Sequence, residues 1–595
     1  MIEWRYRNRL IGLAILMMLA LVGVSTRLVY LHFHLGPGVD RGARITAMRQ
    51  FRERLAVVRG KILDRNGNVL ALDLVKKELC ASPIEIASNR NAQAVAEAIG
   101  RILNVEPCVL LDRIVNRPER QFVYVTGFGH VLEDDQAEAL RRAQLPGVFL
   151  KDAMVRSYPR GASLCHVLGY VNLEPERNGC AGIEQRWDRY LRGVPGLLVG
   201  ERDGRRHEMY NRRLLEIKSC PGANVTLTID QYVQYIVERA LENAVREQRA
   251  TAAWAIVERV RTGEILAMAN IPAFDPRAFR ATAPDAMRNR CIANNYEPGS
   301  TFKVVVVAAA LNEKLVAPAQ IFDCENGTWF YARRPLRDFH PYGNLSVADI
   351  IKKSSNIGAA KIAVLLGNAR LYAYLKQFGI GERTGIELPG EEAGLLYPVS
   401  KWTAISPTRI AIGHEVAVTA LQMLGVLCTI ANDGVRMKPQ IIQQVTDADG
   451  RVLYQQSPVA ISQPIRPDTA RLMKSLLTRV TEEGGTGARA RVEGYNVGGK
   501  TGTAQKAIPG GYSDTLNMSS FMGFIPAEDP QLAIIVVLDE PSNDVRTGGY
   551  VAGPVFKEIA EQSVRYLDIA PQRRCPPQGE VNVASQPGPG VNLGI

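Results

Sequence analysis

One long apolar stretch opens the chain and differs from every segment after it. Residues 10–24 are almost continuously apolar, and the pattern resumes at residues 28–31 after a short polar interruption. The first run alone would form a helix of about 22 Å, shorter than the roughly 30 Å hydrocarbon core of a bilayer. Extended to residue 31, the helix is long enough, with Arg27 able to reach the interface. We therefore expect a transmembrane anchor over residues 10–31.

The residues before this stretch predict its orientation. Arg5, Arg7 and Arg9 precede it, and positive charge before an apolar run favours a cytoplasmic N-terminus. A cleaved signal peptide is the alternative, but no Ala-x-Ala site follows the run. We expect a cytoplasmic tail over residues 1–9 and a single-pass protein of the inner membrane whose remaining residues lie outside the cytoplasm.

Between residues 32 and 220 the pattern changes to short apolar segments separated by turns. Asn66-Gly67 lies between two strand-like segments and predicts a hairpin. Helical periodicity follows around residues 92–103 and 133–143. We expect an elongated domain of mixed helices and strands over residues 32–220.

Cys220-Pro221-Gly222 marks a boundary, after which longer patterns begin. Strand-like apolar patterns occupy residues 225–229, 253–260, 264–269 and 532–538. Helical patterns fill the interval between the early strands and the late one, which predicts an α+β domain with an antiparallel sheet flanked by helices over residues 221–570. The Pro- and Gly-rich residues 571–595 have little to bury and are expected to be disordered.

Composition narrows the possible partners. The formal net charge of +12 suits an anionic membrane face or an acidic wall polymer, although a solvated basic surface explains it equally well. No interleaving of basic and aromatic residues indicates nucleic acid binding. The nine cysteines form no Cys-x-x-Cys and no zinc-ligand spacing, so we expect isolated buried thiols rather than a disulfide framework, and neither a metal nor a cofactor.

The first candidate for chemistry is Ser300-Thr301-Phe302-Lys303. Glu297-Pro298-Gly299 precedes it and an apolar helical run follows, so Ser300 is expected at a helix N-terminus, where free backbone N–H groups are available. The i, i+3 spacing then stacks Lys303 against Ser300. A serine needs a base to become a nucleophile, and lysine serves only if burial or a neighbouring cation such as Lys500 lowers its pKa. A capping serine and a surface lysine are the plain alternative.

A second string, Ser354-Ser355-Asn356, is expected on a link between two short helices. Ser346 and Asp349 resemble a capping box that starts the first helix, which would end near Lys353. Ser354 could relay a proton, and Asn356 could orient Lys303 or hold an amide. Turn residues that satisfy only their own backbone are the alternative.

The third string, Lys500-Thr501-Gly502-Thr503, has two formal interpretations. Residues 494–501 match the Walker A pattern, but a P-loop must open a helix, and the residues after Lys500 are β-prone and broken by glycine. A strand is the better prediction. Its edge could pair with an extended peptide, and Gly502 would let that peptide approach closely.

Together these strings resemble the class B penicillin-binding proteins, and the resemblance covers about residues 59–558. Further matching segments are Arg59-Gly60, Asp64-Arg65-Asn66-Gly67, Tyr158-Pro159, Gly182-Ile183-Glu184, residues 262–268, Gly484-Gly485-Thr486 and residues 553–556. The resemblance implies a membrane anchor, an elongated pedestal domain and a transpeptidase domain with a serine β-lactamase-like fold. Two departures stand out: Ser355 replaces the Asp of the commonest lactamase pattern, and Gly413-His414-Glu415 replaces a loop that is usually Gly-Gln-Gly.

The same resemblance implies a peptidoglycan D,D-transpeptidase in which Ser300 forms an ester with a stem peptide and releases D-Ala. Lys303 would be the base, and Ser354, Asn356 and Lys500 would handle protons and position the substrate. The amides of Ser300 and Thr503 would form an oxyanion hole, with Thr501 and Thr503 near the substrate carboxylate. β-Lactams would acylate the same serine.

Partners follow from the resemblance as well. No region resembles a glycosyltransferase, which implies a SEDS-type polytopic glycosyltransferase and other divisome or elongasome membrane proteins as partners. Tyr170-Val171-Asn172 and the compact pedestal resemble the septal, cell-division type more than the elongation type. A β-lactamase would not need the pedestal and anchor, and a β-lactam sensor would need more than about nine cytoplasmic residues.

Overall fold

The computed structural model describes residues 2–33, 49–88, 91–116, 122–127, 130–173, 177–203, 208–509, 511–542 and 545–571. Helix α1 (Ile2–Phe33) contains the apolar segment Tyr6–Tyr30, which is long and apolar enough to cross a membrane. The predicted anchor is therefore helical throughout. The predicted disordered tail lies outside the described residues except for its first residue.

The chain divides into two compact units, and the first includes the anchor. Unit 1 comprises residues 1–57 and 194–220, and unit 2 comprises residues 58–193 and 221–595. Outside α1, unit 1 contains a three-stranded antiparallel sheet in the order β1 (Gln50–Leu55), β7 (Gly196–Arg202) and β8 (Glu208–Ile217). The predicted division into residues 32–220 and 221–570 remains a prediction.

Unit 2 consists of two segments that are distant in the sequence, and one β-sheet contains strands from both of them. Strand β2 (Ile62–Leu63) pairs with β3 (Val69–Ala81) on one side and, in parallel, with β9 (Asn224–Leu227) on the other. The predicted Asn66-Gly67 turn joins β2 to β3, and the positive φ of Gly67 explains the glycine. Strand β6 (Val148–Ser157) pairs over its full length with residues 72–81 of β3.

A small helical layer packs on the far end of this hairpin. It consists of α3 (Pro83–Ser88), α4 (Ala92–Leu103), α5 (Pro107–Val115) and α6 (Asp134–Ala143). The predicted helices at 92–103 and 133–143 are confirmed, with Glu133 serving as the N-cap of α6. Their apolar faces bury residues such as Ile99, Leu110 and Leu140 against β3, which gives this part its own core.

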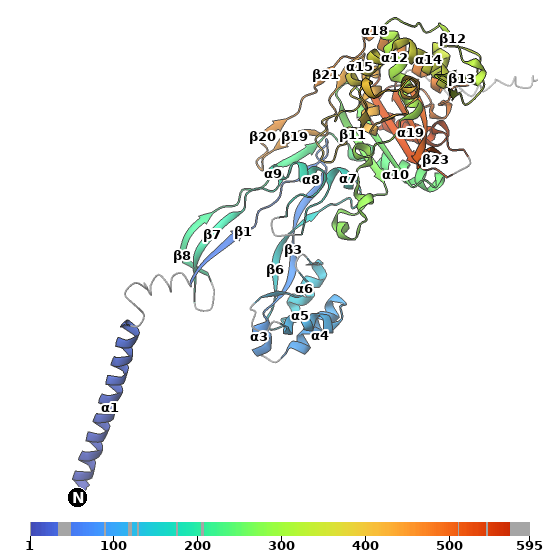
Figure 1. The fold of residues 1–595 in the computed structure, drawn as a ribbon. Helices are drawn as coiled ribbons and strands as arrows, with labels where there is room; N and C mark the ends of the chain where they lie inside the picture. Colours follow the sequence, from blue (N-terminus) through green and yellow to red (C-terminus); the bar gives the residue numbers. More distant parts are fainter. Residues whose placement is uncertain are drawn as a thin grey trace, which may run out of the picture. The chain divides into compact units, whose positions relative to one another are not determined.

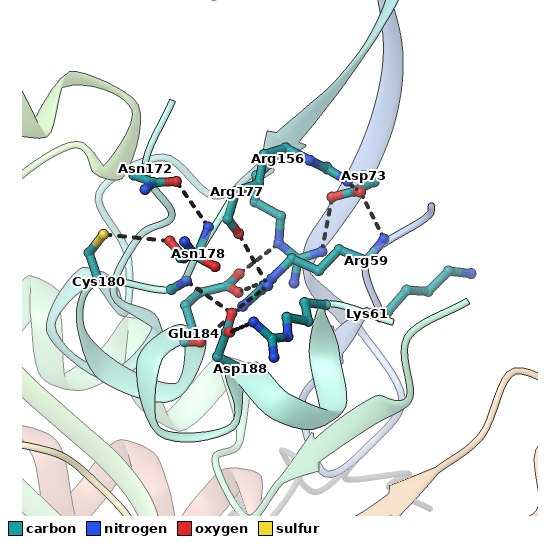
Figure 2. Close-up of polar contacts among 12 residues, drawn as sticks. Arg59, Lys61, Asp73, Arg156, Asn172, Arg177, Asn178, Cys180, Glu184 and Asp188 are labelled. Carbon is teal, nitrogen blue, oxygen red and sulfur yellow. Dashed lines mark hydrogen bonds and ion pairs between the residues drawn. The ribbon is translucent and has the colours of Figure 1, made fainter. Parts of the chain in front are cut away.

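A buried ionic cluster, shown in Figure 2, joins β3, β6 and the short helix α8 (Gly182–Arg186). The Glu184 carboxylate accepts hydrogen bonds from Arg59 Nε and Arg156 Nε, both at 2.6 Å. Asp73 lies 3.3 Å from Arg156 and accepts a 2.6 Å hydrogen bond from Arg177. Asp188 accepts from Arg59 at 2.7 Å. We call these six residues the pedestal ionic cluster; each buried guanidinium in it faces a carboxylate.

The central sheet of unit 2 confirms the predicted α+β domain. Its five antiparallel strands follow the order β11 (Glu264–Ile271), β10 (Ala252–Arg259), β24 (Leu532–Asp539), β23 (Gly511–Ile525) and β22 (Gly498–Ile508). Alternate residues of β10 enter different cores: Trp254 and Ile256 belong to one, Ala255 and Val257 to the other. The sheet is thus covered on both faces, as the continuous apolar runs of its strands require.

Helices from opposite ends of the domain cover one face. The helices α10 (Gln231–Gln248) and α19 (Gly548–Tyr566) lie side by side there (Figure 1). The other face packs against α12 (Lys303–Asn312) and α17 (Ala420–Ala431), whose side chains are almost all buried. The 3₁₀ turn η3 (Gly299–Phe302), directly before α12, contacts the edge strand β22.

The remaining elements surround this core. The helices are α7 (Cys165–Leu168), α9 (Asp188–Leu191), α11 (Arg290–Ala293), α13 (Val347–Lys353), α14 (Asn356–Leu366), α15 (Asn368–Gln377), α16 (Ser406–Ile410) and α18 (Pro467–Thr481). The strands are β4 (Val123–Tyr124), β5 (Val131–Leu132), β12 (Ile321–Asp323), β13 (Thr328–Tyr331), β14 (Arg334–Arg337), β15 (Asn344–Ser346), β16 (Leu395–Leu396), β17 (Val416–Ala417), β18 (Arg436–Met437), β19 (Ile442–Thr446), β20 (Val452–Gln455) and β21 (Ala460–Ser462). The 3₁₀ turns are η1 (Pro276–Ala281), η2 (Pro284–Met287), η3 (Gly299–Phe302), η4 (Glu325–Gly327), η5 (Val399–Lys401) and η6 (Ala488–Ala490). Five cysteines, at positions 80, 165, 291, 324 and 428, are buried free thiols.

Candidate active site

Ser300 lies in the 3₁₀ turn η3, directly before α12, so the predicted helix start is confirmed. Gly299 has a positive φ, and a Cβ there would lie 2.9 Å from the carbonyl oxygen of Thr503. The turn is therefore pressed against strand β22, and only glycine fits. Lys303 is completely buried, whereas Ser300 is partly exposed and has no hydrogen bond through its hydroxyl to another described residue.

The Ser354 hydroxyl joins two buried amines. Lys500 Nζ donates to Ser354 Oγ at 2.8 Å, and Lys303 Nζ donates to the same oxygen at 3.3 Å. Lys303 Nζ also donates to the Ser354 carbonyl oxygen at 2.5 Å and to Asn356 Oδ1 at 2.7 Å. A hydroxyl has two acceptor sites and one donor, so Ser354 retains its hydrogen for another acceptor. The three predicted strings thus meet at one oxygen atom.

Burial changes the protonation of both lysines. It lowers the pKa of Lys303 to about 7, and the negative charge of Asp338 opposes this effect. Burial also lowers the pKa of Lys500 well below its ordinary value, and the charge of Lys303 adds to that effect. Of the two causes allowed by the sequence, burial is therefore the main one for Lys303. At neutral pH a large fraction of Lys303 is an uncharged amine.

The link that carries Ser354 has the predicted form. Ser354 ends α13 with a positive φ of 60°, and Ser355 caps α14 by accepting a hydrogen bond from the amide of Gly358 at 3.0 Å. Asn356 is the first residue of α14 rather than part of the link. Ser346 caps α13 by accepting from the amide of Asp349, as the capping pattern predicted.

Sequence reasoning missed Asp338, which supports this link. Its carboxylate accepts from the Ser355 hydroxyl at 2.7 Å, from the amide of Ile357 at 3.0 Å and from the amide of Asn356. A carboxylate at a helix N-terminus is stabilised by the free N–H groups and the helix dipole. Asp338 thereby supplies a carboxylate beside Ser355, although the string Ser354-Ser355-Asn356 contains no acidic residue. No local pattern marks Asp338, because it lies 17 residues from its partner.

Lys500, Thr501, Gly502 and Thr503 all lie in strand β22, which pairs with β23 and continues to Ile508. The residues that directly follow Lys500 continue the strand and do not open a helix, so the Walker A interpretation is excluded. Thr501 Oγ1 donates to Thr486 Oγ1 at 3.0 Å, whereas Thr503 is exposed and its hydroxyl accepts from the amide of Gly548.

The structure explains why residue 502 is a glycine without invoking a bound peptide. A Cβ at this position would lie 2.3 Å from Ser520 Oγ and 2.9 Å from Thr301 Cγ2. Atoms of the protein itself, including the turn that carries Ser300, therefore require glycine here. The prediction that a peptide also approaches Gly502 remains untested.

His414, treated as an ordinary structural histidine from the sequence, lies close to the turn that carries Ser300. The amide of Gly299 donates to the carbonyl of Gly413 at 3.4 Å, and the His414 ring lies 3.6 Å from Glu297 Oε2 and contacts Tyr512. Burial, followed by the charges of Arg409 and Lys303, lowers its pKa to about 4. The loop at 413–415 thus presents a neutral imidazole beside the site.

Comparison with known proteins agrees with this geometry. Residues 253–561 match the penicillin binding protein transpeptidase domain, and residues 54–227 match the penicillin-binding protein dimerisation domain. Stage V sporulation protein D of Bacillus subtilis is 31% identical over 571 residues, which are 95% of this chain and 87% of that protein. Peptidoglycan D,D-transpeptidase FtsI of Escherichia coli is 31% identical, with 88% of this chain and 86% of that protein covered.

A solved structure extends the likeness to the fold. Penicillin-binding protein 3 of Mycobacterium tuberculosis, complexed with ampicillin, is 27% identical and superposes with a TM-score of 0.68 over 88% of this chain and 98% of that one. The family match over the transpeptidase and dimerisation domains, together with these relatives, places the chain in the class B penicillin-binding protein family.

Proposed function

We propose that this chain is a membrane-anchored peptidoglycan D,D-transpeptidase that cross-links stem peptides through a serine ester. The observation that carries the proposal is the convergence of Lys303 and Lys500 on Ser354 Oγ, with Lys303 one turn after the nucleophile Ser300. The relatives named D,D-transpeptidases support the reaction class. No metal or cofactor is needed for it.

The acylation step uses the lowered pKa of Lys303. The uncharged amine of Lys303 takes the proton of the Ser300 hydroxyl while Ser300 Oγ attacks the carbonyl of the penultimate D-Ala. The proton then passes through Ser354 to the nitrogen of the terminal D-Ala, the C–N bond breaks, and D-Ala leaves. Ser354 suits this transfer because its oxygen already accepts from both amines.

The second step reverses the proton path. A side-chain amine of a neighbouring stem attacks the ester, its proton returns through Ser354, and Ser300 regains its hydrogen. The amides of Ser300 and Thr503 would stabilise the oxyanion in both steps. Lys500, Thr501 and Thr503 would hold the terminal carboxylate of the donor, and Asn356 would orient Lys303 through their 2.7 Å hydrogen bond.

Labelling with fluorescent penicillin followed by peptide mapping tests this assignment. We expect a single labelled peptide that contains Ser300, and we expect Ser300→Ala to abolish labelling without lowering the thermal midpoint. Ser457→Ala, at an exposed position, is the matched control and should label like the native chain. Label at any other residue, or rapid hydrolysis of the penicillin, would contradict the proposal; the second result would indicate a β-lactamase.

We further propose a septal role, with the N-terminus in the cytoplasm, the catalytic unit outside and a SEDS-type glycosyltransferase as partner. The relatives FtsI and stage V sporulation protein D support this proposal, as do α1, which among the described residues is the helix long and apolar enough to span a membrane, and the arginines at its N-terminal end. Depletion in the native organism should block division and produce filaments. Swollen or rounded cells would instead indicate the elongation type.

A further inference from the structure

The hairpin β13–β14 lies next to the active site and has no part in the mechanism above. Its strands pair from Thr328 opposite Arg337 to Tyr331 opposite Arg334, and Ala332 and Arg333 close the turn with positive φ values. Trp329 and Leu336 lie opposite each other and pack on the small core around α14. Since side chains alternate between the faces of a strand, Phe330 and Arg337 lie on the face turned away from that core.

The hairpin combines bare aromatic surface with uncompensated positive charge. Phe330 is 69% exposed, and Phe339, two residues after β14, is 84% exposed. The arginines 333, 334 and 337 are all exposed, and none forms an ion pair with another residue in the described ranges. Exposed aromatic residues beside arginines are typical of recognition surfaces, because both residue types are enriched where proteins bind partners.

Two hydrogen bonds connect this surface to the catalytic lysine. Asn356 Nδ2 donates to the carbonyl oxygen of Arg337 at 2.8 Å, and Asn356 Oδ1 accepts from Lys303 Nζ at 2.7 Å. The next residue, Asp338, holds the N-terminus of α14. Arg409 adds a further guanidinium by donating to the carbonyl of Pro335 at 3.1 Å. The base of the hairpin is therefore joined by hydrogen bonds to Asn356 and, through Asn356, to Lys303.

We propose that the β13–β14 hairpin binds the acidic part of the stem peptide, upstream of the bond that Ser300 opens. This inference rests on the transpeptidase function proposed above. Its basis is charge complementarity: an acidic peptide supplies the carboxylates that the exposed guanidiniums of Arg337 and of Arg333 in the turn lack, and its short apolar side chains can lie on Phe330. The hairpin would thus select substrates that are negatively charged away from the reacting carbonyl.

A matched pair of substrates tests the proposal on the full-length chain in detergent. One is a soluble stem pentapeptide ending in two D-alanines with its upstream carboxylates free, and the other is the same peptide with those carboxylates amidated. The native chain should prefer the acidic peptide by about tenfold in kcat/KM at low salt. Arg333→Gln combined with Arg337→Gln should reduce this preference to about twofold. Arg471→Gln, which alters an exposed arginine of α18, should retain it.

The outcomes separate a failure of the inference about the hairpin from a failure of the proposed transpeptidase function. Equal turnover of the two peptides by the native chain, or an unchanged preference in the double variant, would overturn the inference. The preference should also fall at high salt, because exposed charges are screened. Penicillin labelling of Ser300 in the same samples identifies a failure of the proposed function itself. If the double variant does not label with penicillin, the single variant Arg337→Gln is compared on the same two peptides.

Discussion

Unit 2 contains two groups of buried basic side chains whose pKa values shift in opposite directions. In the pedestal ionic cluster, burial alone would lower the pKa of Arg156, but the charges of Glu184 and Asp73 raise it. In the active site, Lys303 and Lys500 are equally buried, yet their hydrogen-bond acceptors are hydroxyl, amide and carbonyl oxygens. Their pKa values fall instead.

The difference separates a structural cluster from a reactive one. A guanidinium surrounded by carboxylates cannot release its proton, so the pedestal ionic cluster can only hold segments together. An amine without a carboxylate partner can be uncharged at neutral pH and can accept a proton. Burial is common to both places, and the partner decides which role results.

Removing the Lys303 amine should have the largest effect, and it should affect rate rather than stability. Lys303→Met removes the proposed base, so the rate of penicillin acylation should fall by about three orders of magnitude. The free energy of unfolding should change by less than about 2 kcal/mol, because no ion pair with a carboxylate is broken. Stopped-flow acylation and urea unfolding measure the two quantities. A variant that acylates at the native rate would exclude Lys303 as the base.

Breaking the pedestal ionic cluster should reverse this pattern. Glu184→Gln leaves Arg59 and Arg156 without their shared carboxylate, and we expect a loss of about 3 kcal/mol in stability. The folded fraction should still acylate Ser300 at the native rate. The control Glu138→Gln, which breaks exposed pairs on α6, should cost less than about 0.5 kcal/mol by the same urea titration. Equal losses in the two variants would contradict the comparison.

The pH dependence of the acylation rate should report the lowered pKa of Lys303. If the uncharged amine of Lys303 is the base, as proposed, acylation should rise about tenfold per pH unit below its pKa of about 7 and level off above it. Between that value and the unfolded value of about 10.4, the unfolded chain binds more protons, so the contribution of Lys303 to stability also rises with pH. A flat acylation profile between about pH 5 and 9 would contradict this assignment.

The smallest expected effect comes from Asp338. Its charge opposes the burial effect on Lys303, so Asp338→Asn should move the midpoint of the acylation profile to lower pH, by less than about one unit. It should also cost about 1 kcal/mol of stability, because α14 loses its N-terminal carboxylate. Asp323→Asn, at an exposed position in β12, is the control and should leave the midpoint unchanged. A shift to higher pH would contradict the electrostatic role of Asp338.

Much of the fold was predictable because its signals are local. The apolar run of α1, the Asn66-Gly67 turn and the periodicity of residues 92–103 depend on neighbouring positions, and each was found where expected. The strand assignment of Lys500 also followed from local composition, which excluded a P-loop helix. The grouping of residues 58–193 with residues 221–595 did not follow, because it depends on the pairing of β2 with β9 across more than 150 residues.

The sequence identified which side chains can perform the chemistry, since residue type and spacing alone name a serine, a base one turn later and a second lysine. It could not determine the protonation of that base, because pKa depends on everything packed around the amine. Asp338, His414 and the 2.8 Å contact between Lys500 and Ser354 join segments up to 146 residues apart. Only the folded chain brings such groups together, because folding sets both the burial that lowers the pKa of Lys303 and the carboxylate charges that raise the pKa of Arg156.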